Sequence, residues 1–107
     1  MGDNVVVTGA NFQTEVLQSP ALVLLQFGAS WCGSCKTAWP IIEQFAEEYA
    51  GSLKAVKISI EEEGELAERH NVTSLPTLVV YKNGEIVNQV SGGLSKQTIH
   101  ALFKDLL

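Results

Sequence analysis

The two cysteines of the chain, Cys32 and Cys35, lie three positions apart in the segment WCGSCK of residues 31–36. Random placement of two cysteines in a chain of this length would produce that spacing about 2% of the time, so chance explains it poorly. At the start of a helix, such a pair lies on one face, close enough for a disulfide, and the helix dipole and free N–H groups stabilise a thiolate on the first sulfur. The spacing therefore predicts thiol-disulfide exchange, with Cys32 as the exposed nucleophile and Cys35 as the shielded resolving thiol.

Two other uses of the cysteine pair are weaker. A closed zinc site needs four ligands, and only His70 and His100 remain to complete one; both are expected at the surface, on separate helices. An inert structural disulfide is disfavoured because so short a loop restricts the unfolded chain very little.

The sequence predicts a strand before the cysteines and a helix after them, and these two elements must position the pair. Before them, Ala21 to Ala29 forms a nearly continuous apolar run, which is typical of a central strand covered on both faces. After them, the pattern predicts a long helix with Cys32 at or near its start and a kink at Pro40. The apolar residues at helical spacing are Ile41, Ile42, Phe45, Ala46 and Tyr49.

The chain before the central strand is expected to hold a short strand and a brief helix. The strand covers Asn4 to Val7. Asn11 is a suitable N-cap for the helix, which would bury Phe12 and Val16 and end before Pro20.

The rest of the chain continues the alternation of strand and helix. Leu53 to Ile60 and Thr77 to Lys82 are expected strands, with a short polar helix from Gly64 to His70 between them. Asn83-Gly84 predicts a tight hairpin turn into a strand from Glu85 to Val90, and Ser95 opens a terminal helix. The apolar stripe of that helix is Ile99, Leu102, Phe103 and Leu106. The order is β-α-β-α-β-α-β-β-α, an α/β fold with a central mixed β-sheet flanked by helices.

Composition narrows the class of protein. We expect residues 1–107 to form one domain, because 46% apolar and 18% charged residues suit a filled core. A net charge of −5 disfavours nucleic acid and anionic membranes as partners, and the chain shows neither a membrane span nor an export signal, so we expect a cytoplasmic protein. The glutamates at 61, 62, 63, 65 and 68 are interpreted as a solvated helix start and face without a catalytic role.

The chain resembles the thioredoxin family over nearly its whole length. The cysteine motif, a later proline and the hairpin all fall at the spacing of that family, which is more specific than a lone pair of cysteines. The matching segments are Asn11-Phe12, Gln26 to Ala29, Trp31 to Lys36, Pro40-Ile41, Ala46 to Gly51, Leu75 to Leu78, Lys82 to Glu85 and Gly92 to Lys96.

The resemblance implies a thioredoxin fold and reduction of protein disulfides through a mixed disulfide. It further implies a monomer without a bound cofactor, whose redox group is the Cys32–Cys35 disulfide. Its partners would be disulfide-containing client proteins and thioredoxin reductase or an equivalent electron donor. Pro76 would be a cis-proline beside the disulfide, and the backbone of Leu75 would pair with an extended substrate segment. The implied docking surface is Trp31, Gly33, Ser34, Leu75, Pro76, Gly92 and Gly93.

Three residues depart from the family pattern. Gln26 stands where a buried aspartate is usual, Gly28 where a tryptophan is usual, and Ser34 where a proline is usual between the cysteines. Lys57, the usual neighbour of that aspartate, is retained. We expect Gln26, Lys57 and Ser34 to tune proton transfer and the redox balance. The departures leave open a more oxidising disulfide exchanger or isomerase, and a non-catalytic binding scaffold also remains an alternative.

Overall fold

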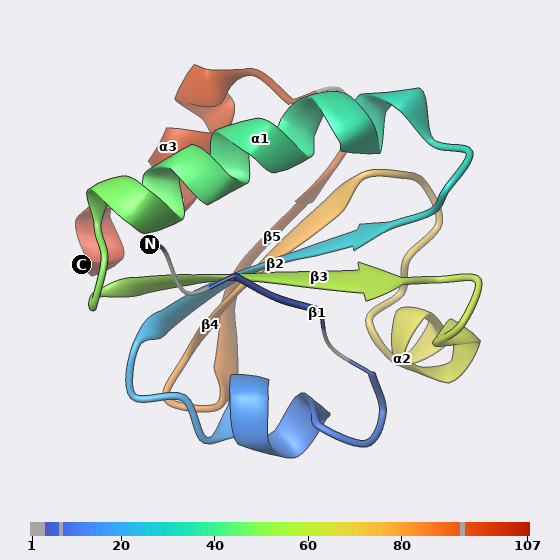
Figure 1. The fold of residues 1–107 in the computed structure, drawn as a ribbon, viewed down its shortest axis with the longest axis horizontal. Coiled ribbons are helices and arrows are strands. Elements are labelled where there is room, and N and C mark those ends of the chain that lie inside the picture. Colours follow the sequence, from blue (N-terminus) through green and yellow to red (C-terminus); the bar gives the residue numbers. More distant parts are fainter. Residues whose placement is uncertain (1–3, 7, 93) are drawn as a thin grey trace.

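A mixed β-sheet forms the centre of the computed structural model, which describes residues 4–6, 8–92 and 94–107 (Figure 1). Within these residues the sheet has five strands in the order β1-β3-β2-β4-β5. β3 is parallel to β1 and β2, whereas β4 is antiparallel to β2 and β5. The strands are β1 (Asn4–Val6), β2 (Leu22–Gly28), β3 (Leu53–Ser59), β4 (Thr77–Lys82) and β5 (Glu85–Ser91).

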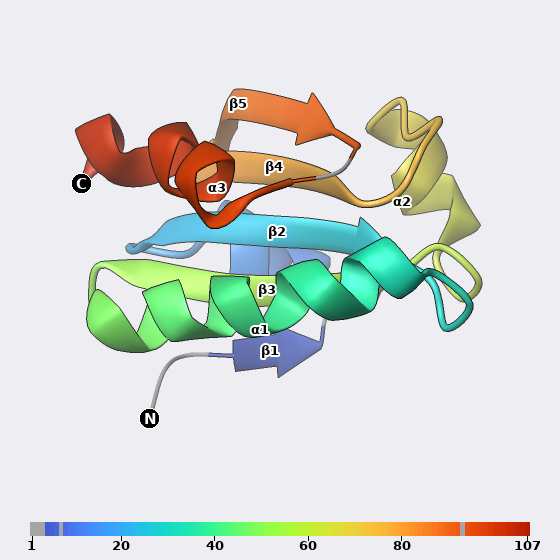
Figure 2. The ribbon, with the colours of Figure 1, turned by 90° about the horizontal axis from the view of Figure 1, so that it is seen from above.

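Helices cover both faces of this sheet, as Figures 1 and 2 show. α1 and α3 pack on one face, while η1 and α2 contribute to the core on the other. The helical segments are η1 (Gln13–Leu17), α1 (Gly33–Glu48), α2 (Gly64–Arg69), α3 (Lys96–Phe103) and η2 (Lys104–Leu106). The predicted α/β order is thus confirmed, with a π-helix as its first helical segment and a 3₁₀ turn added at the end. None of the helices in the described ranges is long and apolar enough to cross a membrane.

Strand β2 is buried along its whole length. Leu22 and Leu24 face the core beneath α1 and α3, whereas Val23, Leu25 and Phe27 face the opposite core. Each strand residue points to the face opposite its neighbour, so a strand covered on both sides needs an unbroken apolar run. This central strand ends directly before the segment that carries the cysteines.

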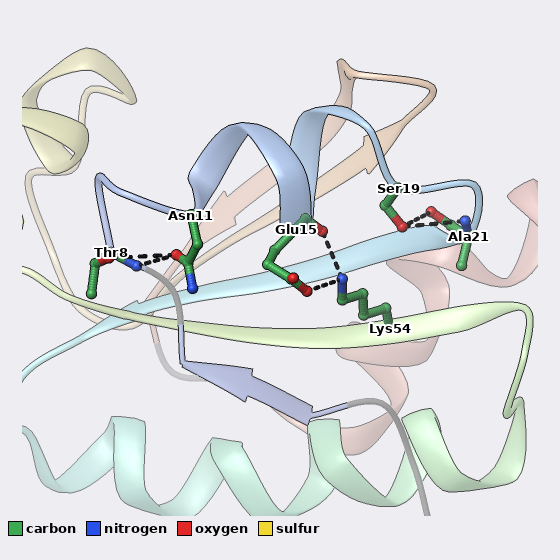
Figure 3. Close-up of polar contacts among 6 residues, drawn as sticks. All are labelled: Thr8, Asn11, Glu15, Ser19, Ala21 and Lys54. Atoms are coloured by element: carbon green, nitrogen blue, oxygen red, sulfur yellow. Dashed lines mark hydrogen bonds and ion pairs between the residues drawn. The ribbon is translucent and has the colours of Figure 1, made fainter.

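Asn11, the predicted N-cap of η1, lies one residue before the N-cap position, and its backbone oxygen accepts a hydrogen bond from Glu15 N–H at 2.9 Å. Its Oδ1 accepts a hydrogen bond from the backbone N–H of Thr8 at 2.7 Å, and the N-cap position belongs to Phe12 (Figure 3). The asparagine thus closes the preceding turn, as short polar side chains often do. η1 is also held to the sheet, because Lys54 Nζ donates to the backbone oxygen of Glu15 at 2.9 Å.

Both histidines contribute to packing, which corrects their predicted surface positions. His70 is only 6% exposed: its Nδ1 lies 2.7 Å from the Leu66 carbonyl oxygen and its Nε2 lies 2.6 Å from the Tyr81 hydroxyl. A carbonyl can only accept, so Nδ1 carries the proton and Nε2 accepts from Tyr81. His100 is half-buried and stacks on Phe45 with ring centroids 5.2 Å apart.

We expect Tyr81→Phe to lower the free energy of unfolding by about 1 kcal/mol, because it leaves the buried Nε2 of His70 without a donor. Burial also raises the pKa of Tyr81. The Tyr81 phenol ionises at a lower pH in the unfolded chain than in the folded protein. The contribution of neutral Tyr81 to the free energy of unfolding is therefore complete below the unfolded pKa, about 10, and is lost as the pH rises through the pKa of the folded protein.

Urea unfolding of the wild type and the variant, measured from neutral to alkaline pH, checks both effects. Tyr49→Phe is the control, since the Tyr49 hydroxyl bonds His100 Nε2 at 3.2 Å in a partly buried position and should matter less. An equal loss in the two variants would argue against the buried pair.

Candidate active site

The cysteines lie at the start of α1, shortly after the end of β2. Cys32 is the N-cap of α1 and has an extended backbone with φ −89° and ψ 105°. Its Sγ accepts a hydrogen bond from the Cys35 N–H at 3.1 Å, and a disulfide joins the two residues across a Cα–Cα distance of 5.3 Å. The free N–H groups and the dipole of a helix N-terminus stabilise negative charge, so this position favours a thiolate on Cys32.

Exposure does not separate the two sulfurs as predicted. Cys32 is 7% exposed and Cys35 is 4% exposed, so neither is an open surface residue. What separates them is the cavity that each residue lines. Cys32 lines a hollow on the front of the site, whereas Cys35 lines a pocket on the side of β2 and β3.

The hollow in front of Cys32, here called the front groove, has a volume of about 420 Å³. Trp31 beside it is 69% exposed, and the predicted docking residues Gly33, Ser34 and Leu75 also line it. Sequence reasoning missed four other lining residues, because no local pattern marks them. These are Ile60, Val72, Thr73 and Ser74.

The other predicted docking residues follow Leu75. The Leu75–Pro76 peptide bond is cis, as the resemblance implied. The Pro76 carbonyl accepts a hydrogen bond from Gly92 N–H at 3.0 Å, and Gly92 adopts a positive φ of 101° that favours glycine. Gly93 lies outside the described residues.

Gln26 lies beneath Cys35 and is 2% exposed. Its Nε2 donates to the Cys35 carbonyl oxygen at 3.4 Å, whereas its Oε1 has no hydrogen-bond partner within the described part of the chain. Lys57 pairs with Gln26 in the parallel register, and its Nζ lies 4.6 Å from the centroid of the Trp39 ring. This cation–π contact explains how an ammonium group is accommodated beside an apolar strand.

Gly28 lets the end of β2 lie close behind Cys35. A Cβ at this position would lie 3.3 Å from Cys35 Sγ and 3.4 Å from Gln26 Nε2. Gly28 also lines a pocket of about 620 Å³, here called the rear pocket. Its lining includes Gln26, Gly28, Cys35, Trp39, Lys57 and Glu61.

Glu61 braces the loop that leads into the cysteine segment, a role that sequence reasoning missed. Its Oε1 accepts from Ser30 N–H at 2.8 Å, and its Oε2 accepts from Ser30 Oγ at 3.1 Å. The Ser30 backbone bond, followed by the Ser30 hydroxyl, holds the pKa of Glu61 below its ordinary value. A run of glutamates hides such a role, since nothing local distinguishes residue 61 from its neighbours.

Comparisons with known proteins agree with this geometry. A model of the thioredoxin family matches residues 3–105. The thioredoxin of Chlorobaculum thiosulfatiphilum is 41% identical over 92 residues, covering 86% of this chain and 85% of that protein. Thioredoxin 1 of Nostoc sp. is 38% identical over 93 residues, or 87% of each chain, and the thioredoxin of Porphyra purpurea is 39% identical over 95 residues, or 89% of each.

Glu61→Gln should release the Ser30 brace, because a neutral amide is a weaker acceptor than a carboxylate. In the wild type the pKa of Glu61 is lowered. The hydrogen bonds from Ser30 to the ionised Glu61 carboxylate are therefore complete above the ordinary glutamate pKa, and they are lost as the pH falls through the lowered pKa of Glu61. The NMR shift of the Ser30 amide followed against pH measures this.

The expected midpoint lies below the ordinary value of about 4.3. Glu61→Gln should abolish the titration, and Glu62→Gln, at the exposed neighbouring position, should preserve it. A Ser30 titration that survives in Glu61→Gln would refute the assignment.

Proposed function

Because the chain belongs to the thioredoxin family and is a thiol-disulfide oxidoreductase, we propose that it acts as a reductant of protein disulfides. The observation that carries this proposal is the Cys32 sulfur at the N-terminus of α1, where it accepts the Cys35 N–H. That position stabilises the thiolate needed for attack on a disulfide.

In the proposed cycle, the Cys32 thiolate of the reduced protein attacks one sulfur of a client disulfide. The client's S–S bond breaks, a mixed disulfide forms and one client sulfur leaves as a thiolate. Cys35 then loses its proton and attacks Cys32 Sγ, so that the Cys32–Cys35 bond forms and the second client thiolate leaves. Two electrons pass to the client, and two solvent protons complete its thiols.

The front groove is the proposed place for an extended client segment. Its backbone would pair beside Leu75 and Pro76, and backbone pairing of this kind needs no particular client sequence. Trp31, Gly33 and Ser34 border the attacking Cys32 and would contact the client as well. Gly92, whose N–H is already bonded to Pro76, is proposed to support this edge, together with Gly93.

The partners and location belong to the same proposal. Members of the thioredoxin family need no bound cofactor and take part in exchange with client disulfides and thioredoxin reductase. We place this chain in the cytoplasm, as a monomer and as a single domain over residues 1–107, with a role in electron transport. Its net charge of −5 disfavours nucleic acid and anionic membranes as partners.

A more oxidising disulfide exchanger or isomerase is the second candidate. Ser34 is exposed in the first turn of α1 beside Cys32, and Gln26 offers no carboxylate beneath Cys35. Both features favour the reduced state with a Cys32 thiolate over the Cys32–Cys35 disulfide, and a protein whose reduced state is stabilised is a stronger oxidant. The measured direction of exchange separates the two candidates, and a non-catalytic scaffold would show no turnover in either direction.

We expect Cys32→Ser to abolish turnover, whereas Cys35→Ser should attack but fail to release its client and so accumulate mixed disulfides. The cause is that only Cys35 can attack the Cys32 sulfur in the second step. Mass spectrometry of each variant after exposure to a disulfide substrate identifies the trapped sulfur. If adducts form through Cys35 in the Cys32→Ser variant and none form in the Cys35→Ser variant, Cys35 is the attacking cysteine and Cys32 the resolving one, contrary to the proposal.

Ser34→Pro should make the reduction potential more negative. The second position of α1 tolerates proline, because its N–H has no partner within the helix. Proline removes both this N–H and a hydroxyl that can donate to the Cys32 thiolate. One hydrogen bond of about 1.4 kcal/mol corresponds to about 30 mV for this two-electron couple.

Equilibration with a glutathione redox buffer measures the potential. Ser34→Ala is the matched control, since it removes the hydroxyl but keeps the N–H and should lie between the two. A wild-type potential equal to or below that of Ser34→Pro would contradict the tuning role.

A further inference from the structure

The rear pocket lies beside Cys35, whose thiol proton has to be removed during the reaction. Under the proposed function Cys35 must lose this proton before it can attack Cys32. The residue beneath it, Gln26, carries an amide, which cannot act as a base near neutral pH. Glu61, in the same pocket lining, is committed to Ser30, and its lowered pKa makes it a weaker base.

The rear pocket reaches Cys35, because Cys35 and Gly28 both belong to its lining. A side chain at position 28 would begin 3.3 Å from Cys35 Sγ, so a larger residue there would crowd the sulfur. A water molecule occupies about 30 Å³ in the liquid, so the rear pocket, at about 620 Å³, has room for several waters or for a small solute.

Gln26 Oε1 indicates which chemistry would fit there. It is a buried acceptor without a partner among the described residues, in a side chain that lines the pocket. Such an acceptor costs about 1–3 kcal/mol when it is left unpaired, so a donor in the pocket is favoured. The Cys35 thiol nearby needs the opposite, a group that takes its proton. An occupant that serves both groups donates one hydrogen bond and accepts one proton.

We propose that the rear pocket is an entry site for small amphiprotic bases, with water as the ordinary occupant, which remove the Cys35 proton in place of a buried carboxylate. The occupant donates to Gln26 Oε1 and takes the proton from Cys35 Sγ. The Cys35 thiolate then attacks Cys32 Sγ, the bond from Cys32 to the client breaks, and the proton leaves with the base. This inference rests on the proposed function, in which Cys35 is the resolving thiol.

Neutral imidazole is a suitable probe, because it has one N–H donor and one basic nitrogen. The reaction to follow is the release of a coloured aromatic thiol from a mixed disulfide preformed on Cys32. Such a leaving group needs no proton, so the rate reports on Cys35. At constant pH and ionic strength, release should rise linearly with imidazole, about threefold or more at high concentration. HEPES, a bulkier base without a ring N–H, should have little effect.

Variants test whether the acceleration uses the pocket. Gly28→Trp fills it and should remove the imidazole effect. Gln26→Leu should also weaken the effect, because it deletes the acceptor while leaving the pocket open. Gln26→Asp supplies an internal base, so release should be faster without imidazole and less sensitive to it. Gln44→Leu, at an exposed site of α1 outside the pocket lining, is the matched control.

The outcomes separate this inference from the proposed function. If the mixed disulfide releases no thiol under any condition, Cys35 is not the resolving residue and the proposed function fails. If release occurs but is independent of imidazole, or if the acceleration persists unchanged in Gln26→Leu, the pocket proposal is overturned and the function stands. Gln26→Leu keeps the test decisive if Gly28→Trp does not fold.

Discussion

The first turn of α1 places three demands on one short segment. Its backbone N–H groups need acceptors, its dipole favours negative charge, and its N-cap and third helical residue must come within disulfide distance. Cys32 meets the first two through the hydrogen bond from Cys35 N–H to its sulfur, and the one-turn spacing meets the third. The fold supports this turn by ending a fully buried strand, β2, at Gly28, so that four residues separate it from the start of the helix at Gly33.

The site has two sides with different chemistry. On the front, Cys32 faces a groove bordered by Trp31 and Leu75, which suits a polypeptide client. On the rear, Cys35 lines a pocket together with Gly28 and with Gln26, whose Oε1 has no hydrogen-bond partner among the described residues. In the proposed cycle, attack and resolution would therefore take place in separate surroundings, although Cys32 and Cys35 are bonded and almost equally buried. A change to one side can alter one step with little effect on the other.

The sequence predicted the elements best where a single local rule decides them. Thr77–Lys82 was predicted to the residue, and Ser95 caps α3 by accepting from Thr98 N–H as expected. The prediction was wrong for His70 and missed the role of Glu61, because a distant partner decides each position. The His70 ring packs against Tyr81 and bonds its hydroxyl, and Glu61, after β3, bonds Ser30, after the neighbouring strand β2. The kink at Pro40 stays a prediction.

The same contrast holds for the site. The cysteine pair and the position of Gln26 beneath it could be predicted from spacing and resemblance. The near-equal burial of Cys32 and the rear pocket could not, since both depend on how loops and α1 pack together in space.

The placement of the tryptophans has a spectroscopic consequence. The chain has two tryptophans; Trp31 borders the front groove and is largely exposed, while Trp39 lines the rear pocket under the Lys57 ammonium. Indole emission depends on polarity and on nearby quenchers, so the two fluorophores report on opposite sides of one disulfide. A chain that retains Trp31 alone gives an optical signal for events on the client side. Trp39 alone gives a separate signal for whatever enters behind Cys35, without any attached label.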